Sequence, residues 1–113
     1  MEARVIRAEE IKEKDYNGTK VADILDTEEW PYFNIVKIRK DGDGKDGFDI
    51  VSNVVYYVLD GEGTCTLEGK EYKLKKGDCI ICPKWTKYKH TKGLILLAIA
   101  YPRFERNKRV YTE

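Results

Sequence analysis

Turn-forming residues recur at short intervals from Tyr32 onward, and this spacing constrains the fold more than any other feature of the chain. The runs between the turns are rich in aromatic and β-branched residues, as in Tyr32 to Arg39, and such runs are typical of strands. About seven or eight short strands are predicted, with a turn signal every ~8–12 residues, which is the pattern of a sandwich or barrel. The sequence therefore predicts an all-β fold.

Several strands can be placed from their turns. A long strand is expected from Phe48 to Leu59, followed by a turn over residues 60–63. A tight hairpin across Glu68-Gly69-Lys70 should pair residues 64–67 with residues 71–74. Other short strands are expected over residues 79–82, 88–90 and 93–101. Residues 8–14 are the only part expected to form a helical turn or two, and the charged residues 103–113 should pack outside the barrel or swap to a neighbour.

Length and charge narrow the class of protein. The 113 residues predict one domain, 1–113, with its barrel core at about residues 32–102. Lys and Arg total 21 against 20 for Asp and Glu, which gives no electrostatic reason to expect nucleic acid or a membrane surface as partner. There is no long apolar run, and the N-terminus carries mixed charge, so a cytoplasmic protein is expected.

Two glycine-centred motifs resemble those of the cupin superfamily. Gly42 is followed by five residues and then Phe48-Asp49-Ile50; after three more residues comes Val54, and after six more Gly61, as in the family's first motif. In the second motif Gly77 is followed by five residues and Pro83, and the later positions hold Trp85, Tyr88 and Lys92. The resemblance implies a cupin-type double-stranded β-helix, a jelly-roll barrel, with a short helical or irregular N-terminal segment.

The family's metal ligands are absent from this chain. They are three histidines and one glutamate, and their positions hold Phe48, Ile50, Val54 and Tyr88. Phe, Ile and Val carry no lone pair, so this set cannot bind Fe, Mn, Ni or Zn. Positions 48, 50 and 54 share one parity on the expected strand and should form one apolar wall. The prediction is a cupin with no metal, no other cofactor and no redox chemistry.

Tyr88 and His90 are the candidate catalytic residues. They lie two residues apart on a predicted strand, so both side chains should face the barrel interior. A tyrosine and a histidine in one pocket could act as acid and base, in loose similarity to the metal-free sugar-nucleotide epimerases of cupin type. The alternative is that Tyr88 only fills space while His90 lies in water at the mouth.

The predicted ligand-binding residues are those expected in the barrel or at its mouth: Phe48, Ile50, Val54, Tyr56, Cys82, Trp85 and Tyr88. Aromatic walls with a few hydroxyls suit a sugar or another flat, neutral small molecule. Three functions stay open. The favoured one is a module that binds a small, carbohydrate-like molecule. The others are a sugar or sugar-nucleotide isomerase or epimerase that uses Tyr88 and His90, and a structural homodimer with a filled barrel.

The cysteines and the basic residues near the mouth allow two interpretations each. Alternation should turn Ile80 and Cys82 inward and Cys79 and Ile81 outward, so the C-x-x-C spacing cannot bind one ion. Buried cysteines that pack as small hydrophobes are expected; the alternative is a soft metal site made by Cys65, Cys82 and His90. Four lysines form a basic stretch beside the expected mouth: Lys84, Lys87, Lys89 and Lys92. This stretch is interpreted as a solvated strand edge; the alternative is that it attracts an anionic ligand.

Outward-facing apolar residues and open strand edges predict a homodimer. Cys79 and Ile81 should lie on the outer face of their strand, where a second copy could cover them. Pairing through a sheet face or an exchanged terminus would also protect the edges that short strands leave exposed.

Overall fold

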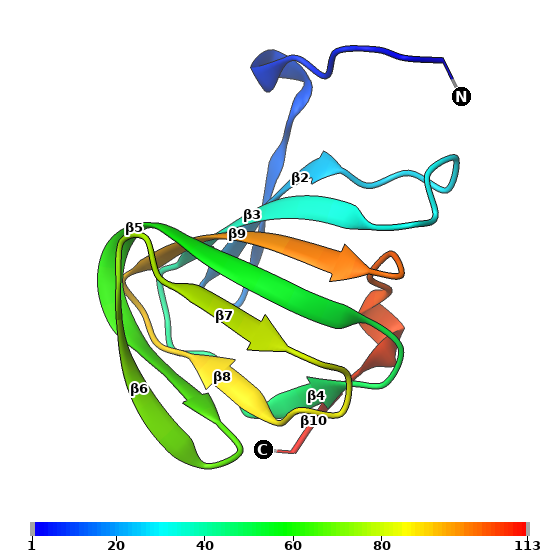
Figure 1. The fold of residues 1–113 in the computed structure, drawn as a ribbon. Coiled ribbons are helices and arrows are strands. Elements are labelled where there is room, and N and C mark those ends of the chain that lie inside the picture. Colours follow the sequence, from blue (N-terminus) through cyan, green and yellow to red (C-terminus); the bar gives the residue numbers. More distant parts are fainter. Residues whose placement is uncertain (1, 113) are drawn as a thin grey trace.

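A computed structural model describes residues 2–112 and shows a curled antiparallel sheet with very little helix (Figure 1). The all-β prediction is confirmed. Within the described residues the only helices are two 3-10 turns, η1 (Ala8–Glu10) and η2 (Arg106–Lys108), and none is long and apolar enough to span a bilayer. The strands are β1 (Glu13–Tyr16), β2 (Thr19–Leu25), β3 (Asn34–Lys40), β4 (Gly47–Asp49), β5 (Asn53–Leu67), β6 (Lys70–Lys75), β7 (Cys79–Cys82), β8 (Tyr88–His90), β9 (Leu94–Tyr101) and β10 (Arg109–Tyr111).

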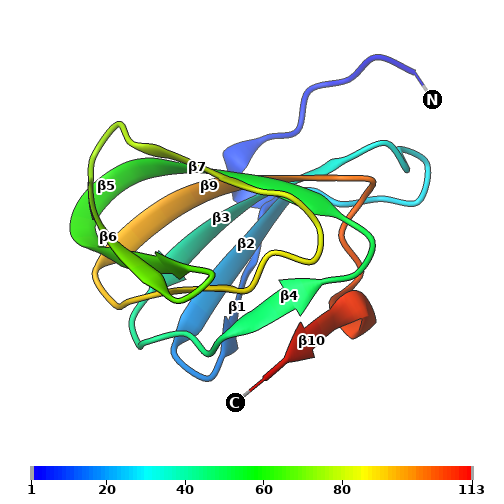
Figure 2. The same ribbon diagram turned by 60° about the horizontal axis from the view of Figure 1, so that its bottom comes forward.

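Strand β5 links the two layers of the barrel. The neighbour order is β1-β2-β3-β9-β5-β8-β4-β10, with β6 and β7 also paired to β5. The first part of β5 pairs with β9 and β7, and its second part pairs with β6 and β8. The strand bends between these parts, where the register slips between Val58 and Asp60 and Gly61 has a φ of +84°. The turn predicted over residues 60–63 is therefore wrong, because this segment stays extended and carries the chain across a corner (Figure 2).

The long strand predicted from Phe48 to Leu59 is also wrong, since the chain breaks between β4 and β5. The carboxylate of Asp49 accepts hydrogen bonds from the backbone N–H groups of Val51, at 2.8 Å, and Ser52, at 2.5 Å. A side chain that caps the backbone in this way forms a local turn in place of a sheet ladder. The break resets the in–out alternation, so residues before Asp49 and after Ser52 no longer share one parity.

The N-terminal region forms a hairpin that the sequence reading missed. Strands β1 and β2 pair across Asn17 and Gly18, whose φ values of +51° and +86° fit a two-residue hairpin turn. The Asn-Gly pair was therefore a hairpin signal. Helical structure is confined to Ala8–Glu10 within the predicted stretch 8–14, because β1 already begins at Glu13. β2 then pairs with β3 and widens the sheet.

The hairpin and the short strands predicted in the second half are confirmed. β6 pairs with β5 across Glu68 and Gly69 alone, so Lys70, predicted in the turn, begins β6, and residues 64–67 pair with residues 70–73 in place of the predicted 71–74. β7 and β8 have the predicted bounds. The fully buried apolar side chains Val58, Leu94 and Leu96 lie in the core between the layers. Each such side chain contributes roughly 1.5–3 kcal/mol by leaving water.

The C-terminal segment becomes part of the barrel. Strand β10 pairs with β4, and the backbone N–H of Thr112 donates to the carbonyl of Asp46 at 2.9 Å. The prediction that residues 103–113 only pack outside or swap away is wrong for Arg109, because β4 holds this strand beside the interior (Figure 2).

Candidate functional site

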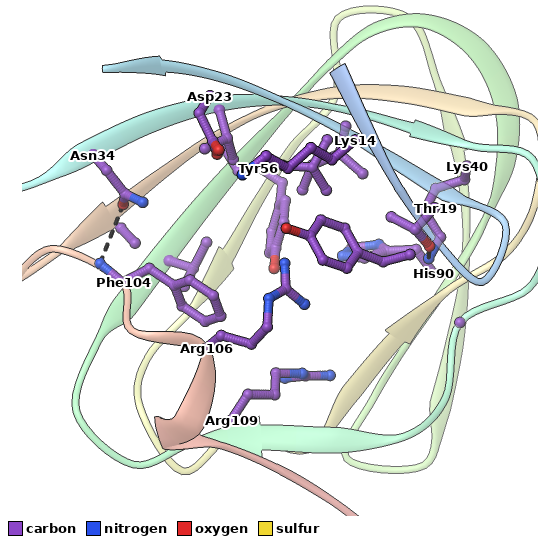
Figure 3. A pocket seen from close by; sticks show the side chains of 18 of the residues that line it. Lys14, Thr19, Asp23, Asn34, Lys40, Tyr56, His90, Phe104, Arg106 and Arg109 are labelled. Atoms are coloured by element: carbon purple, nitrogen blue, oxygen red, sulfur yellow. Dashed lines mark hydrogen bonds between the residues drawn. The ribbon is translucent and has the colours of Figure 1, made fainter. Parts of the chain in front are cut away.

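A cavity of about 870 Å³ lies inside the barrel (Figure 3). Its walls come from strands β1, β2, β3, β5, β8 and β9 and from the C-terminal segment that holds Phe104, Arg106 and Arg109. A cavity of this size can hold a drug-sized molecule. The barrel is not filled, which excludes the filled-barrel form of the structural hypothesis.

Three aromatic side chains meet in the buried part of the cavity. The hydroxyls of Tyr56 and Tyr88 share a hydrogen bond of 2.5 Å. The ring of His90 lies 4.5 Å from that of Tyr56 and 5.5 Å from that of Tyr88, centroid to centroid, in edge-to-face packing. The prediction that Tyr88 and His90 face the interior agrees with their burial and with their position in the cavity wall. These three residues are called the Tyr–Tyr–His cluster below.

The environment of the cluster fixes its protonation states. Burial raises the pKa of Tyr88 to about 12, and burial followed by the neighbouring Tyr88 raises the pKa of Tyr56 well above its usual value. Burial, with the positive charges of Lys40 and Arg109, lowers the pKa of His90 to about 3. Both tyrosines are therefore protonated near neutral pH, and His90 is an uncharged imidazole.

His90 has polar atoms with nothing to bind. Only 6% of the residue is exposed, and among the described residues neither ring nitrogen has a hydrogen-bond partner. A neutral imidazole has one N–H donor and one acceptor nitrogen, and buried polar atoms in proteins are nearly always satisfied. The ring is thus available to one further molecule inside the cavity.

Two cations border the cluster. Lys40, on β3, is 8% exposed and donates to Thr19 Oγ1 at 2.8 Å. Arg109, on β10, donates from Nη2 to the carbonyl of Tyr88 at 3.1 Å, and its guanidinium lies 4.1 Å above the Tyr88 ring. Lys40, Thr19 and His90 lie together on one side of the cavity, and Arg106 and Arg109 enter from the C-terminal segment (Figure 3).

The predicted ligand-binding residues separate into two groups. Val54, Tyr56 and Tyr88 line the cavity, as predicted. Phe48 does not, because the turn at Asp49 resets the alternation; its ring packs instead against Trp85, at 5.6 Å. Ile50 lies in that turn, and Trp85, at 60% exposed, lies on the surface. The predicted common wall of residues 48, 50 and 54 is thus wrong.

The donor set does not fit the family's metal. Of the four ligand positions only Val54 and Tyr88 face the cavity, and neither is a histidine or a carboxylate. Among residues 2–112, no three His, Cys, Asp or Glu side chains lie close enough together to hold a metal ion. That geometry does not support the alternative soft site of Cys65, Cys82 and His90.

Cys82 belongs to the core. It is 1% exposed and lies outside the cavity wall. Burial, followed by the neighbouring Cys65, raises the pKa of its thiol to about 12, so it is uncharged. The predicted alternation from Cys79 to Cys82 is confirmed, with Ile80 and Cys82 buried and Cys79 and Ile81 exposed. Cys82 thus packs as a small apolar residue.

Sequence reasoning missed several cavity residues, and some of them carried a signal. Lys40 shares the strand parity of the cavity residues Val36 and Ile38, so its inward direction follows from the alternation along β3. The Asn17-Gly18 turn could have placed Thr19 beside them. Arg109 carried no signal, because the charged C-terminal segment has no hydrophobic periodicity.

Comparisons with known proteins agree with this architecture. The family model described as "Cupin domain" matches residues 49–93. The uncharacterized protein MJ1618 of Methanocaldococcus jannaschii is 35% identical over 57 residues, or 47% of this chain. That match covers 46% of MJ1618, so it spans about half the length of this curated relative.

Two solved structures illustrate the likeness of fold. A tyrosine-to-phenylalanine variant of Streptomyces PAC13 with uridine has a TM-score of 0.88 at 18% identity, covering 100% of this chain and 93% of that one. PAC13 is described as a nucleoside dehydratase. A RmlC-like cupin from Shewanella frigidimarina has a TM-score of 0.73 at 22% identity, covering 89% and 91%. The chain thus matches the cupin family model over residues 49–93 and has the jelly-roll barrel fold of cupin proteins.

Proposed function

We propose that the barrel binds a small polar organic molecule in its cavity, against the Tyr–Tyr–His cluster. The observation that carries this proposal is His90, whose two buried ring nitrogens have no partner among the described residues. A ligand in the cavity would supply one acceptor and one donor to them. The aromatic rings around His90 offer apolar surface for a flat or ring-shaped ligand.

A nucleoside or a sugar is the class of ligand that these groups suit. Both combine a ring with several hydroxyls, which fits a wall of apolar, aromatic and hydroxyl-bearing residues such as Val54, Tyr56 and Tyr88. The fold neighbour PAC13, solved with uridine, supports trying nucleosides first. The carbohydrate-like ligand inferred from the sequence belongs to the same chemical class.

Substituting His90 with phenylalanine is the test of this proposal. Calorimetric titration of the wild type with uridine and with D-glucose should give saturable binding to at least one of them. The His90→Phe variant should bind that ligand about tenfold more weakly, because the ligand's polar atoms would then be buried without partners. Tyr72→Phe on β6, where the tyrosine is 41% exposed, should change nothing. An unchanged affinity in His90→Phe would refute the role of this ring.

An isomerase or epimerase that uses Tyr88 and His90 is the second candidate. In its favour, Tyr88 is a protonated phenol inside the cavity, in contact with an uncharged imidazole. Against it, a pKa of about 3 makes His90 a weak base, and no described carboxylate accepts a hydrogen bond from its ring. Binding is therefore the function that we favour. If the protein catalysed the exchange of deuterium from heavy water into a bound sugar, the isomerase or epimerase would become the favoured function.

We also propose that the chain forms a homodimer through the outer face of the layer that contains β7. Cross-strand pairing aligns Ile81, Val55, Ile99 and Ile35 in one row over β7, β5, β9 and β3. Ile81 is 68% exposed in the single chain. A second copy would remove this apolar row from water.

Introducing a charge into that row should abolish the dimer. Ile81→Glu should elute as a monomer in size-exclusion chromatography with light scattering, because an unpaired carboxylate would be buried at the interface. Glu71→Lys, which changes an exposed charge on β6, should leave the wild-type mass unchanged. A monomeric wild type would contradict the proposal.

A further inference from the structure

Two cations from distant parts of the chain line the cavity and lie near enough to His90 to affect its charge. Lys40 extends from β3 and Arg109 from β10, and the positive charges of both residues lower the pKa of His90. Burial and then the charge of Arg109 lower the pKa of Lys40, so the two cations also repel each other. Figure 3 shows both side chains directed into the cavity.

Neither cation has a carboxylate partner among the described residues. The hydrogen bond of Lys40 goes to the hydroxyl of Thr19, and that of Arg109 goes to a backbone carbonyl. Arg109 Nη1 is buried and has no acceptor. Asp43, whose charge favours the protonated form of Lys40, accepts its hydrogen bond from the backbone amide of Lys92, at 2.9 Å.

An arrangement of this kind is costly without an anion. Lys40 is buried and Arg109 is half-buried, and charges withdrawn from water are normally paired, because removing an ion from water costs several kcal/mol. The rings beneath and beside the guanidinium of Arg109, those of Tyr88 and Tyr111, hold it in place but do not neutralise it. A negatively charged acceptor group on a ligand would therefore satisfy both cations, the Nη1 of Arg109 and the N–H of His90, and the other His90 nitrogen would still need a donor.

We propose that the ligand of this cavity carries an anionic oxygen group, a carboxylate or a phosphate, and that Lys40 and Arg109 bind that group beside His90. The inference rests on the proposed function, because it concerns the same cavity and the same ligand. The guanidinium offers planar N–H donors that match either group, and the ammonium adds a point charge. The rest of the ligand then lies along the Tyr–Tyr–His cluster.

Matched pairs of neutral and anionic ligands test this assignment. Uridine is compared with uridine 5′-monophosphate, and D-glucose with D-glucuronate, by calorimetric titration of the full chain. Wild-type protein should bind the anionic member of at least one pair about tenfold more tightly than the neutral member. A preference for the nucleotide alone identifies a phosphate as the anion, a preference for the glucuronate alone identifies a carboxylate, and either supports the proposal.

Two variants assign the preference to the two side chains. Lys40→Met and Arg109→Met should each weaken binding of the anionic ligand by about tenfold, the effect of losing one charge-assisted hydrogen bond, and so remove most of the preference over the neutral ligand. Binding of the neutral ligand should change about twofold or less. Lys37→Met removes a cation from the exposed face of the same strand, β3, and should leave both affinities unchanged.

The outcomes separate the two proposals. If the wild type binds neutral and anionic members equally, the anion subsite is wrong and the proposed function stands. If the wild type binds none of the four compounds, the proposed function itself is refuted, and the anion subsite that rests on it is refuted with it. The wild-type comparison needs no variant, so it decides the question even if Arg109→Met does not fold. Without ligand, Lys40→Met should melt at or above the wild-type temperature, because it removes an unpaired buried charge; a melting temperature well below wild type would show that Lys40 serves stability.

Discussion

Replacing Gly61 with alanine should lower the free energy of unfolding by about 3 kcal/mol or more. Gly61 has a φ of +84°, a conformation that costs an L-residue roughly 1–2 kcal/mol. The added Cβ would also collide with the backbone carbonyl oxygen of Gly93. That backbone cannot move away freely, because the adjacent Leu94 pairs with Gly61 in the ladder between β5 and β9. Urea denaturation followed by circular dichroism measures the change.

Gly69→Ala is the matched control for Gly61→Ala. Gly69 has a similar φ of +81° in the hairpin between β5 and β6, but a Cβ built there meets no atom within 4 Å. Only the conformational cost of about 1 kcal/mol remains at that position. If both variants lost the same free energy of unfolding, the close approach of Gly61 to the Gly93 carbonyl would contribute nothing to the cost of Gly61→Ala.

Acidification from pH 6.5 to pH 4.5 should destabilise the fold by about 2–3 kcal/mol through His90 alone. The pKa of His90 is about 3 in the folded chain and about 6.5 when the chain is unfolded. Between these values the unfolded chain binds a proton that the folded chain does not. Stability is therefore complete above pH 6.5 and falls by about 1.4 kcal/mol per pH unit as the pH drops toward 3.

The pH effect is isolated by comparing the wild type with His90→Phe. The imidazole faces Lys40 on β3, Arg109 on β10, Tyr56 on β5 and Tyr88 on its own strand, β8, and phenylalanine keeps the ring contacts without a titratable group. Carboxylates elsewhere titrate in both proteins and cancel in the difference between the two unfolding free energies. That difference should shift by about 2–3 kcal/mol in favour of the variant over the two pH units. Parallel curves would instead mean that the folded protein protonates His90 as easily as the unfolded chain does.

Local patterns in the sequence determined the fold class and the direction of many side chains. Alternation along a strand is set by backbone geometry alone, so Ile80 and Cys82 were predicted inside and Cys79 and Ile81 outside, as found. The same rule brought Tyr88 and His90 to the interior. Glycines that need unusual backbone angles marked the hairpin at Gly69. The loss of the family's metal ligands was likewise visible in the sequence, because residue identity alone decides whether a side chain has a lone pair.

Alternation fails where a tertiary or local contact interrupts the strand. The carboxylate of Asp49 binds two backbone N–H groups and resets the pattern, which removed Phe48 and Ile50 from the predicted wall. Gly61 has the opposite effect, since a residue typical of turns allowed β5 to bend and continue. Asp and Gly are both typical of turns, and only the contacts that each makes in the folded chain decide whether it ends a strand or bends it.

Alternation along β3 is enough to turn Lys40 inward, but the meeting of Lys40 with Arg109 in one subsite depended on the tertiary structure. Lys40 and Arg109 lie far apart in the sequence and belong to segments rich in charge, where an exposed position is the default expectation. Pairing of β10 with β4 moves Arg109 inside, and the curl of the sheet brings β3 opposite β8. Sequence periodicity encodes the face of each strand on which a side chain lies. Which distant faces then close around one cavity is decided only when the whole barrel folds, because that depends on long-range pairing.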